Sequence, residues 1–144
     1  MIKKIFSIFI YILLTGCDTL TGPEESNYLE LSAPSLSRNS DGYYMMTANT
    51  NLQQTFTTLK ASTGSIEIPQ LLTWESNKEF SIEWQGQTIW ENVVNGSSYT
   101  DDEGYGYTVL GIYDIFIGDT IKVYCGFVDD YDNYYEDYLE VIVE

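Results

Sequence analysis

Short runs of alternating apolar and polar residues recur along most of the chain. At 79–84, Phe80, Ile82 and Trp84 alternate with polar residues, and at 120–128 every second residue is apolar. Successive side chains of a β-strand point to opposite faces, so both runs predict strands with one apolar face. Further strands are predicted at 28–31, 43–48, 55–62, 71–74, 88–90, 105–110 and 138–143. No stretch of ten or more residues keeps a helical period, so the pattern predicts an all-β domain.

Turn-forming residues separate these runs. Asp41-Gly42 precedes one strand, Gln85-Gly86-Gln87 lies inside a predicted hairpin, and Asp102-Glu103-Gly104 and Gly118-Asp119 precede two later strands. These residue types favour tight turns between antiparallel strands. Seven to eight short strands at this spacing predict one β-sandwich domain over residues 28–144.

The first apolar run has a different character. Met1-Ile2-Lys3-Lys4 is a positive start, and the run from Ile5 to Leu14 is too short to span a bilayer as a helix. This order is typical of a secretory signal peptide. The following Leu14-Thr15-Gly16-Cys17 resembles the lipobox of bacterial lipoproteins. That resemblance implies a signal peptide over 1–16, cleavage after Gly16, and lipid on Cys17. Two or three acyl chains would anchor the protein firmly to a membrane.

Residues 17–27 are polar, contain Gly22-Pro23, and show no periodicity, which is typical of a flexible tether. The formal net charge is −16 and would become −18 once Lys3 and Lys4 leave with the signal peptide. Such a chain repels nucleic acid, which we exclude as a partner. Asp18 follows the lipidated cysteine, but sorting rules differ between bacteria. The expected location is therefore the cell envelope, lipid-anchored and extracytoplasmic, with the membrane and leaflet left open.

The order of the strands resembles that of an immunoglobulin-like sandwich. The segment 55–62 would be strand B, Trp74 the tryptophan of strand C, and 79–90 the C′/D region. The remaining strands E, F and G would be 105–110, 120–128 and 138–143. Strand B has no cysteine to pair with Cys125, and no tyrosine precedes Cys125 by two residues. A different β-sandwich or a small barrel therefore stays open.

Cys125 has no disulfide partner if Cys17 takes lipid, and we expect a small buried core residue. The chain has no histidine, which disfavours zinc, copper and iron sites. We also expect Trp84, Trp90, Tyr105 and Tyr107 to fill half-buried strand faces.

Acidic residues concentrate in two predicted loops. The resemblance to an immunoglobulin-like sandwich implies that these two loops, D–E and F–G, share one end of the domain. Their side-chain oxygens are of the kind that Ca²⁺ binds. The candidate ligands are Asp101, Asp102, Glu103, Asp129, Asp130, Asp132, Asn133 and Asp137. The second loop is no EF-hand, because Tyr134 stands where an oxygen ligand belongs. The alternative is a solvated hairpin tip whose charges face water.

Tyr131, Tyr134 and Tyr135 surround the same acidic loop. Exposed tyrosines beside carboxylates suit stacking on a sugar or recognition of a protein. We therefore expect a binding or scaffold module whose partner is a protein, with a carbohydrate-binding accessory protein as the alternative. A small hydrolase using loop carboxylates is a remote third, since the sequence has no histidine base and no G-x-S-x-G motif.

Overall fold

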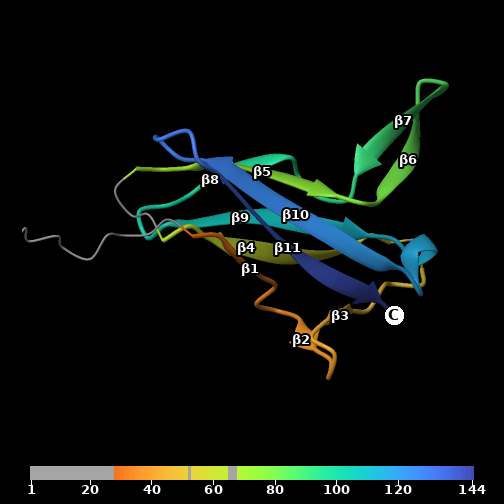
Figure 1. The fold of residues 1–144 in the computed structure, drawn as a ribbon. Helices are drawn as coiled ribbons and strands as arrows, with labels where there is room; N and C mark the ends of the chain where they lie inside the picture. The colour runs from red at the N-terminus through yellow and green to blue at the C-terminus, as the bar shows by residue number, and fades with distance from the viewer. Residues whose placement is uncertain (1–27, 52, 65–67) are drawn as a thin grey trace, which may run out of the picture.

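The computed structural model describes residues 28–51, 53–64 and 68–144. The signal peptide, Cys17 and the tether lie outside these residues. Eleven strands and one short 3₁₀ helix form the described part (Figure 1). The elements are β1 (Glu30–Ser32), β2 (Ser37–Arg38), β3 (Tyr44–Met46), β4 (Thr55–Ser62), β5 (Leu71–Ser76), β6 (Glu79–Trp84), β7 (Gln87–Asn92), β8 (Ser97–Tyr99), β9 (Tyr105–Ile112), η1 (Asp114–Phe116), β10 (Thr120–Val128) and β11 (Tyr134–Val143). Within the described ranges, no helix is both long and apolar enough to cross a membrane.

Two sheets form a β-sandwich, as predicted. One sheet has the order β1-β4-β9, and the other has the order β2-β3-β11-β10-β5-β8. The strands expected as B and E pair in the first sheet, and those expected as C, F and G are neighbours in the second. One pairing departs from the antiparallel expectation, because β3 runs parallel to β11.

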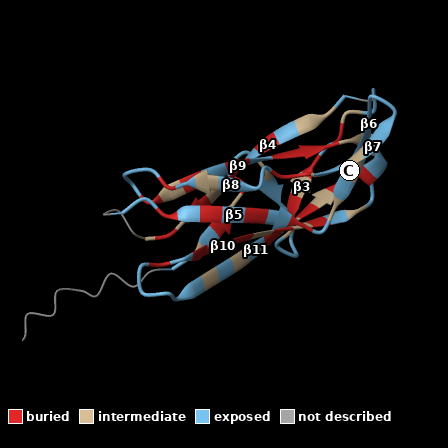
Figure 2. Ribbon diagram, turned by 90° about the horizontal axis from the view of Figure 1, so that it is seen from above, coloured by how far each residue is buried: buried red, intermediate tan, exposed pale blue. Residues whose placement is uncertain are grey.

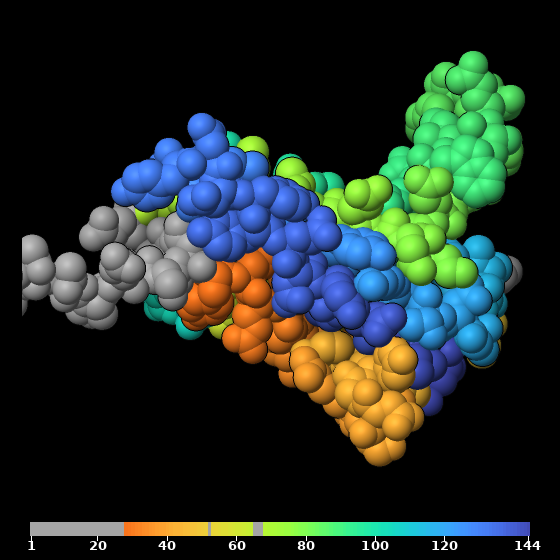
Figure 3. Space-filling model, viewed as in Figure 1, coloured from red at the N-terminus to blue at the C-terminus, as the bar shows by residue number. Residues whose placement is uncertain are grey.

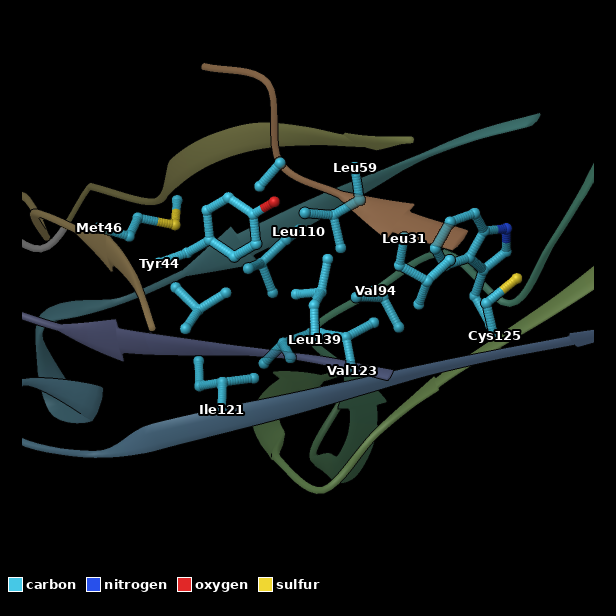
Figure 4. Close-up of a cluster of buried hydrophobic side chains, with 14 of the residues drawn as sticks. Leu31, Tyr44, Met46, Leu59, Val94, Leu110, Ile121, Val123, Cys125 and Leu139 are labelled. Carbon is cyan, nitrogen blue, oxygen red and sulfur yellow. The ribbon is translucent and has the colours of Figure 1, made fainter. Parts of the chain in front are cut away.

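The core lies between the inward faces of these sheets (Figure 4). Leu59 and Leu110 from the first sheet and Ile121, Val123 and Val141 from the second are completely buried. These residues occupy alternate positions of their strands, which is why the period of two located them. Burial of such side chains is the main free-energy gain of folding.

Two expected core residues are confirmed. Trp74 on β5 is 4% exposed, and its indole N–H donates to Ser98 Oγ at 2.9 Å. Cys125 is a free, buried cysteine near the middle of β10, where it pairs with Trp74 across the strands. The alternation at 120–128 predicted the buried side for Cys125, and the resemblance to an immunoglobulin-like sandwich predicted a core position for Trp74.

The segment 79–90 is not part of either sheet, which corrects its expected place in the C′/D region. Strands β6 and β7 pair only with each other and form a two-stranded hairpin. Gln85 and Gly86 have φ values of 51° and 77°, the left-handed pair that a two-residue hairpin turn requires. We call this hairpin, residues 79–92, the arm; Figures 1 and 3 show it standing away from the sandwich.

Strand β11 begins four residues earlier than predicted, at Tyr134. The segment 134–137 has no apolar alternation, but it pairs in continuous register with β10 up to Val128. The two short strands β2 and β8 were not predicted as strands at all. Their backbone pairing follows from the neighbours β3 and β5 rather than from their own residues.

Candidate functional site

Three turns of the sandwich share one construction. In each, an Asn or Asp side-chain oxygen accepts hydrogen bonds from the backbone N–H groups two and four residues later. The fourth residue of each turn has a positive φ. The first residues are Asn39, Asp101 and Asp129, and the fourth residues are Gly42, Gly104 and Asp132. Asp101 and Asp129 are therefore turn-forming residues first, whatever else they bind.

Asp129 is the most enclosed acidic residue of these turns, at 6% exposure. Its Oδ1 accepts from the N–H groups of Tyr131 and Asn133, both at 2.9 Å. Its Oδ2 accepts from Asn133 Nδ2 at 3.0 Å and from the Tyr135 hydroxyl at 3.2 Å. Four donors thus compensate the burial of this carboxylate.

The expected calcium ligands are only partly brought together. The turns at 101–104 and 129–133 do lie at one end of the sandwich, at the ends of β9, β10 and β11. Asp137, expected in the loop, instead lies within β11, where its Oδ2 accepts from Leu31 N–H at 3.1 Å. Within the described residues, no group of three or more acidic or cysteine side chains is placed to hold a metal ion. Calcium at Asp101, Asp102, Glu103, Asp129, Asp130, Asp132, Asn133 and Asp137 stays a prediction.

The three expected stacking tyrosines have different surroundings. Tyr131 at the turn is 84% exposed, and Tyr134 is 62% exposed. Tyr135 corrects the expectation, because its ring stacks on Phe127 with centroids 4.9 Å apart and packs against the core. Only the first two rings can therefore offer a face to a ligand.

The arm presents the most exposed tryptophans. Trp84 and Trp90 are 60% and 66% exposed, which corrects their expected role as half-buried residues. Trp84 shares a face with Ile82 and Ile89, since Ile82 pairs directly with Ile89, whereas Trp90 lies on the other face. Figure 2 shows the arm as mostly exposed over both strands. Phe80 at its base contacts Tyr113 edge-to-face at 5.1 Å, which ties the arm to the sandwich.

The outer face of the larger sheet carries a second aromatic surface. Its central strand β10 presents Tyr124 and Gly126 outward, and β11 presents Tyr134, Glu136 and Tyr138 beside them. A shallow pocket of about 170 Å³ lies over Gly126. We call it the Gly126 pocket; its lining includes Thr73, Glu75, Tyr124, Gly126, Tyr134 and Glu136.

Gly126 leaves room for the Tyr134 side chain at the floor of this pocket. A Cβ atom there would lie 2.6 Å from the Tyr134 hydroxyl oxygen and 3.0 Å from two carbons of the ring. The hydroxyl donates to Glu136 Oε2 at 2.6 Å, which raises the pKa of Tyr134. The glycine therefore lets the hydroxyl end of the tyrosine ring lie across β10.

The sequence analysis missed Glu75, Tyr124, Gly126 and Glu136 as candidate site residues. The available signal was the glycine in the middle of a strand, which often marks a close approach to a backbone. The alternation also placed Gly126 on the outward face, opposite to Cys125. The residues that surround Gly126 come from the neighbouring strands β11 and β5. The order β11-β10-β5 brings them together, and the alternation of residues within a strand does not predict that order.

Cys125 lies beneath this face, and its environment makes the thiol unreactive. Burial, and secondarily the negative charge of Asp137, raises the pKa of its thiol from 9.0 to about 12. The thiolate is the reactive form of cysteine, so very little of it exists at neutral pH. A role as a nucleophile has no support from this environment.

Comparisons with known proteins give only distant similarity in fold. No family model matches the chain, and no curated protein matches it. Among solved structures, the chain is similar to Spo0M, a sporulation control protein from Bacillus subtilis, with a TM-score of 0.38 and 10% identity. The match covers 83% of this chain and 49% of that one, so this chain spans about half of its length.

Proposed function

We propose that this protein is a lipid-anchored, extracytoplasmic binding module of the bacterial cell envelope, and that its arm contacts a protein partner. The observation that supports this most is the arm itself. It is a two-stranded sheet that stands outside the sandwich and carries two exposed tryptophans. Isolated two-stranded hairpins are at best marginally stable in water, so a surface that covers this one would stabilise it.

The chemistry of the arm suits a protein interface. Tryptophan is enriched among the residues that dominate binding energy, and each ring buries roughly 150–250 Å² when it is covered. Ile82 and Ile89 extend the apolar surface beside Trp84. Within the described chain, the outer edges of β6 and β7 have no strand partner, so an extended segment could add to either edge.

The position of the arm also supports this proposal. Tyr28, the first described residue, donates its backbone N–H to Thr63, near the turns at 101–104 and 129–133. The arm leaves the other end, where Asn77 N–H donates to Lys122 and Lys78 pairs with Asp119 at 2.8 Å. Lipid on Cys17 would therefore attach the chain at one end of the sandwich, and the arm leaves the other end.

Site-specific photocrosslinking in intact cells tests the proposed contact. A benzophenone amino acid replaces Trp84 in one variant and Trp90 in another, and a third variant carries it at Tyr131, at the opposite end. We expect a discrete adduct after irradiation from one or both arm positions and none from Tyr131. Serine at Ile82 and Trp84 should then weaken the adduct formed from position 90.

The same adduct from Tyr131, or none from either arm position, would rule out the arm as the contact surface. The serine substitutions should leave the melting temperature nearly unchanged. Neither side chain belongs to the core of the sandwich, so the substitutions leave the burial that stabilises the fold in place. This control separates loss of binding from loss of folding.

A carbohydrate ligand is the second candidate, favoured by the exposure of Tyr131 and Tyr134. An exposed ring can stack on the apolar face of a sugar. Affinity electrophoresis in gels that contain envelope polysaccharide tests this candidate. Retardation that disappears with Tyr131→Ser and Tyr134→Ser, but persists with Trp84→Ser, would favour carbohydrate over a protein at the arm.

A further inference from the structure

The positive side chains of the described chain are all engaged. Arg38 lies 4.3 Å from the Tyr44 ring centroid, and Lys60 lies 3.3 Å from that of Tyr105. Lys122 lies 3.5 Å from the Tyr138 centroid. The fourth, Lys78, pairs with Asp119. Three of these four cations therefore rest on tyrosine rings, a contact in which the electron-rich face of the ring attracts the charge.

Tyrosines also line the Gly126 pocket, but none of the four positive side chains of the described chain does. Tyr124 lies between the pocket and Lys122, because Lys122 precedes it by two residues on β10 and Gly126 follows it by two. Lys122 Nζ is 5.2 Å from the Tyr124 centroid but sits closer to Tyr138. On the Gly126 side, Tyr124 and Tyr134 line the pocket together with two acidic residues, Glu75 and Glu136.

The carboxylates approach the pocket from opposite sides. Glu75 is on β5 and Glu136 is on β11, the two strands that flank β10. Neighbouring strands lie about 4.8 Å apart, so the two backbones are on the order of 10 Å apart across the floor. The Tyr134 hydroxyl covers Gly126 itself, and the pocket of about 170 Å³ beside it can take the head of a long side chain. Tyr134 already donates to Glu136, which fixes that carboxylate beside the floor.

We propose that the Gly126 pocket binds the guanidinium or ammonium group of an arginine or lysine side chain on the protein partner. Tyrosine faces and carboxylates together are selective for such cations, and a neutral sugar would gain nothing from the charge. The formal net charge of −16 favours a basic partner over the whole surface. This inference rests on the proposed function for the protein nature of the partner, but it concerns the sheet face and not the arm.

NMR titration of the isotope-labelled full chain in non-ionic detergent tests the pocket directly. The probe is the blocked peptide acetyl-Gly-Arg-Gly-amide, with its citrulline counterpart as a neutral match, at fixed ionic strength. We expect a saturable shift of the Gly126 amide with arginine and none with citrulline. Equal shifts with both peptides would overturn the proposal, because the charge would then play no part.

Charge-removing variants separate this pocket from general attraction to an acidic protein. Glu75→Gln with Glu136→Gln should weaken arginine-peptide binding by roughly fivefold or more, because both ion pairs are lost. Glu79→Gln with Glu91→Gln makes the same change of charge on the arm and should leave the affinity unchanged. Equal weakening by both pairs would overturn the pocket. All four glutamates are exposed, so neither pair should impair folding.

Butylguanidinium, which has the same cationic head without a peptide, distinguishes the source of the cation. A shift with butylguanidinium but not with the peptide would assign the pocket to small free cations and overturn a protein side chain. Tyr134→Leu should weaken peptide binding while leaving both glutamates in place. The titration reports on the Gly126 amide and the crosslink on the arm, so a failed crosslink and a failed titration point to different errors.

Discussion

Cys125 illustrates how burial alone sets the chemistry of a residue. Its thiol is 1% exposed, and the pKa rises from 9.0 to about 12. In the unfolded chain the thiol ionises at its ordinary value, whereas in the folded protein it stays protonated until much higher pH. Its contribution to stability is therefore complete below about pH 9 and is lost as the pH rises toward 12.

We predict a steeper alkaline loss of stability for the parent than for Cys125→Ala, which has no thiol to ionise. By pH 10 the parent should have lost about 1 kcal/mol more than the variant, relative to pH 8. Urea melts in the presence of a reductant measure this difference. All other ionisable groups are common to both proteins and cancel in the comparison. Parallel curves for the two proteins would mean that the thiol ionises normally in the folded state.

The carboxylate of Asp129 has a structural role, which the hydrogen bonds that it accepts define. Asp129→Ala would leave two backbone N–H groups, one amide and one hydroxyl without their acceptor. We predict a loss of about 2–3 kcal/mol in unfolding free energy. Asp129→Asn keeps one oxygen for the turn and should lose less. Asp130→Ala, at an exposed position of the same turn, should stay within about 0.5 kcal/mol.

The outcome of this series bears on calcium as well. Chemical denaturation in EDTA gives the unfolding free energies of these variants in the absence of calcium. If Asp129→Ala costs no more than Asp130→Ala there, the four hydrogen bonds do not hold the turn. Repeating the melts in CaCl₂ and in MgCl₂ at matched ionic strength then tests the calcium prediction for the same residues.

Among the elements, the arm shows what an alternating pattern can and cannot specify. Phe80, Ile82 and Trp84 do share one face of a strand, and β7 does pair back as a hairpin. Alternation predicts which side chains share one face of a strand, but it does not predict which part of the protein covers that face. In β10 the same kind of pattern faces the core, because the larger sheet packs against the smaller one on that side. Strands β6 and β7 of the arm pair only with each other, outside the two sheets of the sandwich.

Fluorescence tests the exposure of the arm separately from binding. The three tryptophans divide into Trp74, buried in the core, and Trp84 and Trp90 on the arm. We predict that most emission is quenched by the neutral reagent acrylamide in the native protein. Replacing both arm tryptophans with phenylalanine should leave a blue-shifted, poorly quenched signal from Trp74. Strong quenching of that remaining signal would mean that Trp74 is also accessible.

The fold was more predictable than the candidate site. The strands of the sandwich follow from local alternation, so β4, β5, β9 and β10 could be predicted from their own residues. The Gly126 pocket instead combines Glu75, Tyr124 and Glu136 from three strands, which only the strand order brings together. The acidic turns show a different limit. Their local chemistry suggests a metal, which stays a prediction, but it did not reveal that Asp101 and Asp129 accept the hydrogen bonds that build the turns.

The whole molecule has two distinct ends. Tyr28 and the acidic turns lie at one end, and the arm leaves the other. Eleven residues, 17–27, can span at most roughly 40 Å. An anchor at Cys17 would therefore hold the acidic end toward the membrane and direct the arm outward.

The anchor that this arrangement needs is tested by the two cysteines, which serve as matched variants. Cys17→Ser should abolish lipid attachment, so that the protein moves from the detergent phase to the aqueous phase or stays unprocessed. Cys125→Ala should partition as the parent does, because its thiol is buried in the sandwich and takes no lipid. Mass spectrometry of the N-terminal peptide should show acyl chains on Cys17 in the parent and in Cys125→Ala. If Cys17→Ser still enters the detergent phase and has the parent's N-terminus, something other than lipid on Cys17 holds the protein. The outward direction of the arm would then lose its basis, while the arm and the Gly126 pocket would remain as surfaces to test.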